Sequence, residues 1–285
     1  MPTRSVVITG ASTGIGRACA LHLDGKGWHV FAGVRKPEDG VALKSLASKR
    51  LTTVMIDVSE KASISQAEAA IRESLEQVGL AALVNNAGIT VQGPLEHLPL
   101  DELRHQMEVN VIGQLAVTQA LLPLIRKANG RIVFMGSVGG RAPSLPFLGP
   151  YIASKYAIEA IPESLRLELL SAGIKVSIVE PGTIKTPLWE KGYADVDRIA
   201  EWLTPEGRQR YLEPMKRFAE FARKAERRGT PPEKVALKVE HALTSSHPKI
   251  HYLVGDAWTR AWVEANLPKP VRDRLLSRLV LGRDP

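Results

Sequence analysis

Cysteine is almost absent from this sequence, and its scarcity excludes one class of fold at once. The 285 residues include a single cysteine, Cys19, so no disulfide can form within the chain. A small scaffold held by disulfides is therefore excluded, and the composition fits a reducing compartment. Cys19 lies among apolar residues at helical spacing, which predicts a buried side chain.

Long apolar runs, internal repeats and low-complexity tracts are absent as well. No uninterrupted apolar stretch approaches the ~18 residues typical of a membrane-spanning helix. Residues 1–4 lead directly into a short apolar run, without the layout of a signal peptide. With 44% apolar and 24% charged residues, the composition is that of a soluble globular protein. We expect a cytoplasmic protein without an integral membrane segment, built as one domain with additions.

The net charge of +8 is not concentrated in any dense basic block. Residues 1–190 contain 19 Lys and Arg against 17 Asp and Glu, and residues 191–285 contain 19 against 13. The excess is spread among acidic residues and has no interleaved aromatic stripe. We therefore expect a solvated basic surface and no binding to nucleic acid.

The patterns of a metal site and of a serine hydrolase are also missing. His247 and His251 are four residues apart, but Pro248 and an expected strand prevent a helical ligand pair. Residues 136–139 contain a serine between glycines, but not at the G-x-S-x-G spacing of a hydrolase. We expect no metal centre and no hydrolase chemistry.

What the sequence does contain is a regular alternation of apolar strands and amphipathic helices. Helices are expected at 15–25, from 36 toward 49, at 60–78, at 100–128 and from about 151, the last one kinked or broken at Pro162. Strands are expected at 4–9, 29–34, 51–56, 81–84, 131–135, 174–179 and 250–254. Strands that are nearly all apolar are typical of a parallel sheet covered by helices on both faces. The sequence therefore predicts a doubly wound α/β fold.

The last third of the chain loses this alternation and reads as mostly helical. We expect a single domain over residues 1–285, with a lid at 187–228 and a C-terminal extension at 256–285. In our interpretation the lid is mobile and shapes a lipophilic pocket, although its apolar residues can equally serve to pack it onto the domain. These residues are Leu188, Trp189, Tyr193, Trp202, Leu203 and Met215.

A glycine-rich turn follows the first strand. It runs Thr9-Gly10-Ala11-Ser12-Thr13-Gly14-Ile15-Gly16. Glycines at this place allow a tight turn and a close approach of the backbone to a pyrophosphate at a helix N-terminus. The spacing differs from the common G-x-G-x-x-G fingerprint, and such turns also occur without ligands. Its position after the first strand of an alternating pattern favours dinucleotide binding.

Tyr151 and Lys155 form a candidate acid/base pair. Their spacing of four residues places them on one face of a helix. A free tyrosine has a pKa of about 10, which a neighbouring ammonium group lowers, so Tyr151 can act as general acid/base. Ser137, after the fifth strand, can form a hydrogen bond to the reacting oxygen. The alternative is that Tyr151 is a core residue and Lys155 a solvated one.

Five features in register resemble the short-chain dehydrogenase/reductase family over about residues 4–188. They are the glycine-rich turn, Asn85-Asn86-Ala87-Gly88, Ser137, the Tyr151 and Lys155 pair, and a Pro181-Gly182 turn. The segment 247–257 and the following Leu267-Pro268 resemble members that act on steroids, retinoids and other lipophilic alcohols. The resemblance implies a Rossmann-like fold and an oxidoreductase that interconverts an alcohol and a carbonyl.

The resemblance also implies roles for individual residues. The catalytic residues would be Asn110, Ser137, Tyr151 and Lys155, with Asn110 holding a water in the proton relay and Lys155 also holding the nicotinamide ribose. The cofactor would be bound by Gly10, Ser12, Thr13, Gly14, Ile15, Gly16, Arg35, Asp57, Val58, Asn86, Ala87, Gly88, Tyr151, Lys155, Pro181, Gly182, Thr183, Ile184 and Thr186.

The end of the second strand decides the expected cofactor. An acidic residue there would bind the ribose hydroxyls of NAD and repel a 2′-phosphate. This sequence has Val34 and Arg35 instead, with no acid before Glu38. By resemblance, Arg35 takes the position of the NADP-type arginine, so NADP is expected rather than NAD.

Two other functions stay open at this point. One is a 3-oxoacyl-carrier-protein-type reductase, although such chains usually stop soon after the last strand. The other is a non-catalytic dinucleotide-sensing or interaction protein, which would commonly lack the tyrosine or the lysine. The expected partner is a small lipophilic alcohol or ketone, and the resemblance suggests a homodimer or homotetramer.

Overall fold

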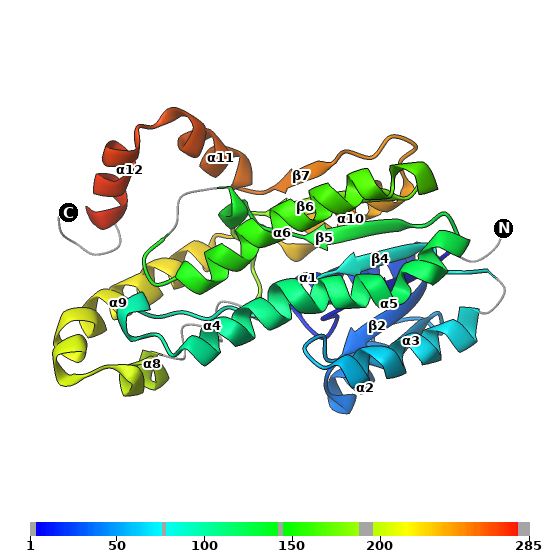
Figure 1. Cartoon of the computed structure of the whole chain (residues 1–285), viewed down its shortest axis with the longest axis horizontal. Coiled ribbons are helices and arrows are strands. Elements are labelled where there is room, and N and C mark those ends of the chain that lie inside the picture. Colours follow the sequence, from blue (N-terminus) through cyan, green and yellow to red (C-terminus); the bar gives the residue numbers. More distant parts are fainter. Residues whose placement is uncertain (1–3, 76–77, 142–144, 188–195, 279–285) are drawn as a thin grey trace.

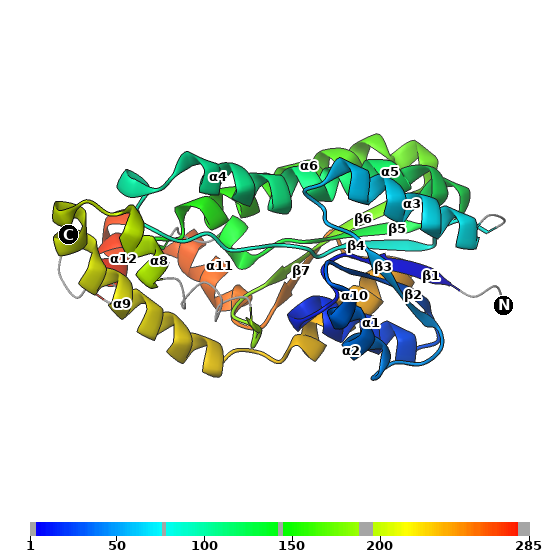
Figure 2. The ribbon, with the colours of Figure 1, turned by 90° about the horizontal axis from the view of Figure 1, so that it is seen from below.

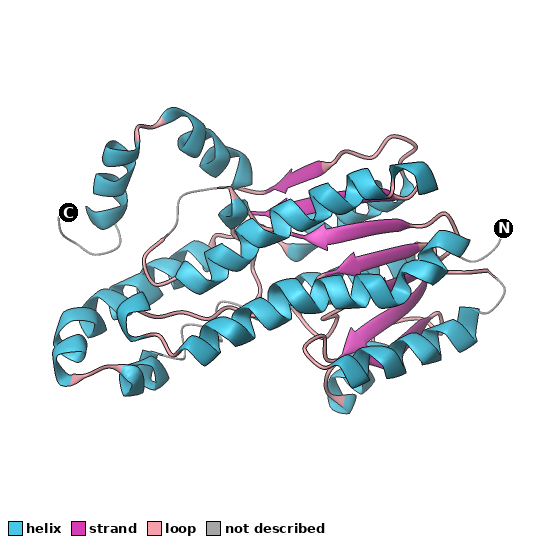
Figure 3. Ribbon diagram, viewed as in Figure 1, coloured by secondary structure: helices cyan, strands magenta, loops and turns pink. Residues whose placement is uncertain are grey.

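A parallel sheet of seven strands forms the centre of the computed structural model, which describes residues 4–75, 78–141, 145–187 and 196–278. The strand order is β3-β2-β1-β4-β5-β6-β7, and each neighbouring pair is parallel (Figures 1 and 3). The strands are β1 (Ser5–Ile8), β2 (His29–Val34), β3 (Leu51–Met55), β4 (Ala82–Asn85), β5 (Arg131–Met135), β6 (Lys175–Pro181) and β7 (His251–Val254).

Helices cover both faces of this sheet, as Figure 2 shows. One face carries α1 (Gly14–Gly25), α2 (Pro37–Lys44) and α10 (Pro232–Thr244), and the other carries α3 (Lys61–Leu75), α4 (Leu100–Met107), α5 (Gly113–Lys127) and α6 (Gly149–Glu168). Beyond the sheet lie α8 (Val196–Trp202), α9 (Pro205–Arg227), α11 (Ala257–Asn266) and α12 (Lys269–Leu276). The predicted doubly wound, single-domain α/β fold is confirmed.

The strands are apolar because they supply two separate cores. Val6 and Ile8 of β1 point to the core under α1 and α10, whereas Val7 between them points to the core under α3 and α5. The same alternation recurs along β2 and β4, so almost every residue of these three strands is buried. Cys19 belongs to the first core, where burial raises the pKa of its thiol to about 12.

Helix α6 is not broken at Pro162, so that part of the prediction is wrong, whereas a kink there stays a prediction. Helix α6 continues from Gly149 through Glu168, with Pro162 buried inside it. Proline removes one hydrogen bond of the helical ladder. Here the helix is held along its length by the sheet, where Ile158, one turn earlier, is fully buried. Tertiary packing therefore outweighs the local preference.

One helical stretch within the described part of the chain, Leu100–Lys127, is long and apolar enough to cross a bilayer by length and composition. Its apolar face is used inside the protein, because Val117, Leu121 and Ile125 pack in the core under the sheet. These core contacts explain why the stretch is so apolar.

Part of the expected lid can be followed in the structure. Leu203 and Met215 are buried. Trp202 of α8 lies against Gly93, because a Cβ added to Gly93 would be 3.3 Å from the Trp202 ring. These residues pack the lid helices onto the domain. Leu188, Trp189 and Tyr193 lie outside the described residues, so the mobility of the lid stays a prediction.

The two turns that follow β1 and β4 are joined where the strand order reverses. The Thr9 hydroxyl oxygen accepts hydrogen bonds from the backbone N–H groups of Asn86 and Ala87, both at 3.0 Å. The Asn86 side chain donates to the Gly10 carbonyl at 3.1 Å. Gly10 has a φ of +65°, and a Cβ there would lie 2.8 Å from the Ala87 Cα. Only glycine fits between these two backbones.

Replacing Thr9 by valine should destabilise the protein through these two N–H groups. Thr9→Val keeps the side-chain shape but leaves two donors unpaired at a fully buried position, and each such donor costs about 1–3 kcal/mol. We expect the free energy of unfolding in urea to fall by about 2–4 kcal/mol. Thr9→Ser keeps the oxygen and is the matched control, with an expected loss of about 1 kcal/mol for one methyl group. Equal losses in the two variants would contradict this role of the hydroxyl.

Candidate active site

A cavity of about 280 Å³ opens at the carboxyl edge of the sheet. This is the edge where open α/β sheets bind their ligands, beside the point at which the strand order reverses. The lining residues come from the carboxyl ends of strands and the segments that follow β1 to β6, from the helical turn Glu108–Ile112 and from α6. Segments that are far apart in the sequence therefore meet around one space.

Nineteen of the predicted site residues line this cavity. They are Gly10, Ser12, Thr13, Gly14, Ile15, Arg35, Asp57, Val58, Asn86, Ala87, Gly88, Asn110, Ser137, Tyr151, Lys155, Pro181, Gly182, Ile184 and Thr186. The structure thus brings the expected catalytic and cofactor-binding residues together, and their individual roles stay predictions.

Two predicted residues do not line the cavity. Gly16 lies beneath the glycine-rich turn, where a Cβ would be 2.2 Å from the Gly10 carbonyl oxygen, so it serves the close packing of α1. Thr183 is turned toward Asp256: its N–H donates to the carboxylate at 2.6 Å and its hydroxyl at 3.1 Å. These contacts assign both residues to the support of the neighbouring turns.

Several lining residues were not expected from the sequence. They are Gly33, Ile56, Ile89, Thr90, Val109, Met135, Gly136 and Pro187. Most of them are apolar residues at or next to a strand end. The sequence indicates them only because they lie next to a recognisable polar motif, as Gly136 lies next to Ser137.

Lys155 and Tyr151 lie together on the inner face of α6. Each is 6% exposed, and the Lys155 Nζ is 5.7 Å from the centre of the Tyr151 ring. The Lys155 ammonium donates to the Met135 carbonyl at 2.8 Å. Burial lowers the pKa of Lys155 to about 8, although the negative charge of Glu159 opposes this shift. The alternative of a solvated lysine is wrong.

Asn110 lies in a π-helical turn, Glu108–Ile112, between α4 and α5. Its amide oxygen accepts from the Ile89 N–H at 2.8 Å, and its amide nitrogen donates to the Ile89 carbonyl and to the Ser154 hydroxyl. Such wide turns are frequent at functional sites. Here the side chain fixes the segment after Gly88 at the wall of the cavity and ties it to α6.

Ser137 follows β5 with an extended backbone and begins a short helical turn, Val138–Gly140. Its hydroxyl oxygen accepts from the Gly139 N–H at 3.0 Å. The hydroxyl hydrogen is therefore available to a ligand oxygen in the cavity. The local hydrogen bond fixes the direction of the side chain.

Arg35 and Asp57 bring two opposite charges to the lining of the cavity. Arg35 follows the buried Val34 and is exposed at the rim. Asp57 accepts hydrogen bonds from the Ser59 N–H and hydroxyl at 2.9 and 2.6 Å. Partial burial opposes ionisation of Asp57, but these bonds and the charge of Arg35 outweigh it and lower its pKa.

These features define a dinucleotide-binding α/β protein with a Ser-Tyr-Lys site. Residues 4–197 match the family model of the short chain dehydrogenases. The chain belongs to the short-chain dehydrogenase family, and it is an oxidoreductase of that family.

Several named proteins are similar to this chain. It is 36% identical over 262 residues to an NADPH-dependent 3-dehydrocapnine reductase from Ornithobacterium rhinotracheale, covering 88% of each chain. It is 36% identical over 279 residues to mouse retinol dehydrogenase 5, covering 95% of this chain and 87% of that protein. A crystal structure of a short-chain dehydrogenase from Streptomyces avermitilis superposes with a TM-score of 0.77 at 28% identity, covering 99% and 98% of the two chains.

Burial of the Lys155 ammonium should lower the free energy of unfolding. A neutral side chain at this position should therefore raise it. A pKa lowered from 10.5 to about 8 corresponds to roughly 3 kcal/mol at pH 7, partly offset by the hydrogen bond to Met135. We expect Lys155→Met, without cofactor, to raise the free energy of unfolding by about 1–3 kcal/mol.

The sign of the pH dependence follows from the same shift. Between pH 8 and 10.5 the unfolded chain holds the Lys155 proton longer than the folded protein, so stability rises with pH in this window. Lys155→Met should remove this rise, whereas Lys238→Met at an exposed helix position should keep it. A urea titration at pH 7 and pH 10 measures both, and an unchanged rise in the first variant would show that the amine is hydrated.

Proposed function

We propose that this protein is an NADP(H)-dependent dehydrogenase or carbonyl reductase that acts on a lipophilic alcohol or ketone. The observation that carries the proposal is the meeting of Ser137, Tyr151 and Lys155 at one cavity with the glycine-rich turn. A core tyrosine and a surface lysine would not share a cavity with an anion-binding turn.

The turn after β1 fits the pyrophosphate of a dinucleotide. Thr13, at the start of α1, forms no side-chain cap hydrogen bond, and residues Ser12 to Ile15 line the cavity. The first backbone N–H groups of α1 therefore remain for an anion. Gly14 has a φ of +55° and a Cβ there would contact Thr186 at 3.2 Å. This supports a turn shaped for close backbone approach.

Arg35 supports NADP over NAD. It stands at the rim of the cavity, directly after the buried Val34, which takes the position where an NAD-binding chain would carry an acidic residue. A guanidinium group forms charge-assisted hydrogen bonds to a phosphate. The similarity to a reductase named as NADPH-dependent points in the same direction.

The proton chemistry belongs to Tyr151. In the direction of reduction its hydroxyl donates a proton to the carbonyl oxygen of the substrate, while Ser137 donates a hydrogen bond to the same oxygen. The positive charge of Lys155 stabilises the phenolate left behind and so favours the transfer. NADP(H), when bound by the residues from Gly10 to Ile15, Arg35, Asp57 and Lys155, supplies the hydride chemistry.

An apolar wall beside Tyr151 supports a lipophilic substrate. The cluster around Tyr151 consists of Leu148 just before α6, Ile152 in α6, and Phe218, Ala219 and Ala222 in α9, with Phe147 packed against it. Helix α9 thus contributes the aromatic ring of Phe218 to the apolar cluster that contains Tyr151. Among the similar proteins, retinol dehydrogenase 5 is named for such an alcohol.

Four further expectations remain parts of the proposal. They are a lid at 187–228, an extension at 256–285, a cytoplasmic location and a homodimer or homotetramer.

Tyr151→Phe should remove turnover while cofactor binding is retained. The substitution keeps the ring but removes the proton donor, and a general acid/base group contributes about 10²- to 10⁴-fold. We expect kcat with NADPH and an apolar ketone to fall in that range, with the NADPH Kd within about threefold in a fluorescence titration. A loss of kcat below tenfold would contradict the assignment, and no turnover in the unmodified protein would favour the sensor alternative.

Arg35→Ala should weaken binding of NADP and leave that of NAD unchanged. A charge-assisted bond to the 2′-phosphate contributes about 1.5–3 kcal/mol, which corresponds to about 10- to 100-fold in Kd. Val34→Asp combined with Arg35→Ala should reverse the preference, and calorimetric titration with both cofactors measures it. Equal affinities of the unmodified protein for the two cofactors would show that Arg35 does not bind the phosphate.

A further inference from the structure

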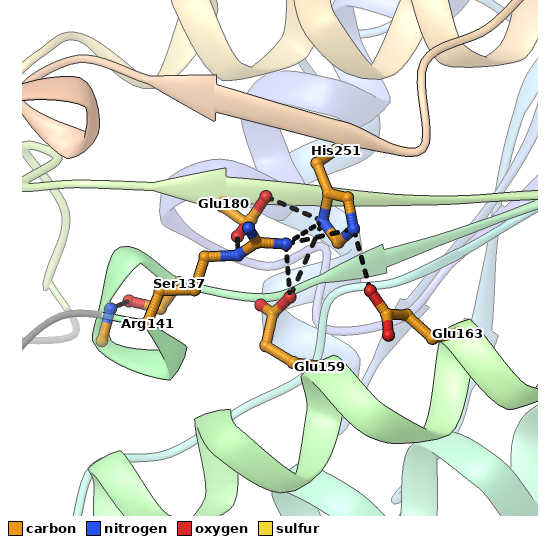
Figure 4. A network of polar contacts seen from close by, with 7 residues as sticks. Ser137, Arg141, Glu159, Glu163, Glu180 and His251 are labelled. Atoms are coloured by element: carbon orange, nitrogen blue, oxygen red, sulfur yellow. Dashed lines mark hydrogen bonds and ion pairs between the residues drawn. The ribbon is translucent and has the colours of Figure 1, made fainter. Parts of the chain in front are cut away.

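A cluster of charged side chains lies behind the Ser137 turn, outside the residues that line the cavity (Figure 4). It consists of Arg141, Glu159, Glu163, Glu180 and His251, which we call the Arg141 cluster. Each member comes from one of four elements: the Ser137 turn, helix α6, strand β6 and strand β7. The cluster therefore joins the segments that carry Ser137, Tyr151 and the Pro181-Gly182 turn.

Arg141 is at the centre of this cluster. Its Nε forms an ion pair with Glu180, and its Nη2 lies 3.6 Å from a Glu159 carboxylate oxygen. The same Nη2 is 2.6 Å from the His251 Nδ1. The His251 Nδ1 also lies 3.1 Å from a Glu180 carboxylate oxygen, and its Nε2 lies 3.1 Å from a Glu163 carboxylate oxygen.

The two inner carboxyl groups are expensive to bury. Glu180 is fully buried, and both Glu159 carboxyl oxygens are buried without a hydrogen-bond partner among the described residues. Burial, and then the negative charge of Glu180, raise the pKa of Glu159 to about 8, although Arg141 opposes the shift. Such groups are weak evidence for stability. We therefore explain these two carboxyl groups by the segment that they hold in position.

What they hold is the turn that begins at Ser137. The Gly140 N–H donates to the Ser137 carbonyl at 2.9 Å and the Arg141 N–H to the Val138 carbonyl at 3.0 Å, so residues 137–141 form one unit. Glu159 lies against the residue before this unit and against Gly140 within it. An added Cβ at Gly136 would be 2.7 Å from its carboxylate, and one at Gly140 would be 2.8 Å from its Cγ.

Lys155 and Glu159 are one helical turn apart on α6. A shift of the Ser137 turn relative to Glu159 is therefore a shift relative to Lys155 and Tyr151. Ser137 and Tyr151 must reach the same substrate oxygen within hydrogen-bond distance, and small misplacements in such sites cost large factors in rate.

We propose that Arg141 is a positioning residue, which by binding Glu180, Glu159 and His251 holds the Ser137 turn at the distance from Tyr151 that the reaction requires. The proposal deepens the proposed function and rests on it. Among the described residues, Glu159, Glu180 and His251 also form a group of potential metal donors within 4.8 Å of one another. The Arg141 guanidinium contacts all three, so the cation of this cluster is the arginine itself.

A double-mutant cycle between Arg141 and Ser137 tests the proposal. Arg141→Met should lower kcat with NADPH and a ketone at least tenfold, with the KM for NADPH changed less than twofold. In the Ser137→Ala background the same substitution should change kcat less than twofold, because the group that Arg141 positions is gone. Equal fold losses in both backgrounds would overturn the proposal and leave Arg141 a residue of general stability.

Two further variants guard against simple unfolding. Arg141→Met leaves Glu180 buried without its cation, so Arg141→Met with Glu180→Gln removes both charges together and should show the same dependence on Ser137. Arg72→Met is the matched control, because it removes an exposed ion pair with Glu68 on α3 and should change neither kcat nor the cycle.

Hydrogen exchange of the backbone amides gives a readout that does not need turnover. Exchange of the Gly139, Gly140 and Arg141 amides should become at least tenfold faster in Arg141→Met, and in the variant that also carries Glu180→Gln, but not in Arg72→Met. Unchanged exchange would overturn the proposal even if activity fell. An unmodified protein that turns over no alcohol or ketone would instead contradict the proposed function, while the exchange result would still decide whether Arg141 holds the turn.

Discussion

The close packing of two backbone turns, one after β1 and one after β4, is the constraint on which the rest of this structure depends. Gly10 and Ala87 approach so closely that no side chain fits between them, and the Thr9 hydroxyl joins the two turns. This contact sets where α1 begins and therefore where its unpaired N–H groups point. It also fixes the chain that Asn110 then ties to α6. The cavity therefore depends on this one contact between the turns after β1 and β4. From these turns the chain continues to helices on opposite faces of the sheet.

Burial of charge is the second determinant of the site, and it acts against stability. Lys155 is buried, and its ammonium donates to the Met135 backbone carbonyl. The buried Glu180 and the buried carboxyl oxygens of Glu159 lie in the neighbouring Arg141 cluster. A protein selected only for stability would replace all three by apolar residues. Their presence in one region, on the elements that carry Ser137 and Tyr151, indicates that this part of the core serves chemistry before it serves folding.

The sequence predicts the sheet and most of the cavity because both depend on local patterns. Apolar strands such as 29–34 and 131–135 coincide with the observed ones. The glycine-rich turn and the Tyr151 and Lys155 pair are recognisable because they stand in register with the expected strands and with the other motifs. Other features depend on tertiary contacts that spacing does not contain. Helix α6 continues through Pro162 because the sheet holds it, Thr183 turns away toward Asp256, and the Arg141 cluster gathers residues more than a hundred positions apart. No periodicity in the chain signals such a meeting.

The contact between Thr183 and Asp256 has a consequence for how this chain can be recombined with others. Asp256 directly precedes α11, and its carboxylate accepts from both the N–H and the hydroxyl of Thr183 in the turn after β6. The loop on the substrate side is thereby anchored to the first residues beyond the last strand. A chimaera that exchanges the C-terminal segment should place its junction after residue 256, because a junction at the end of β7 would separate the anchor from the loop it fixes.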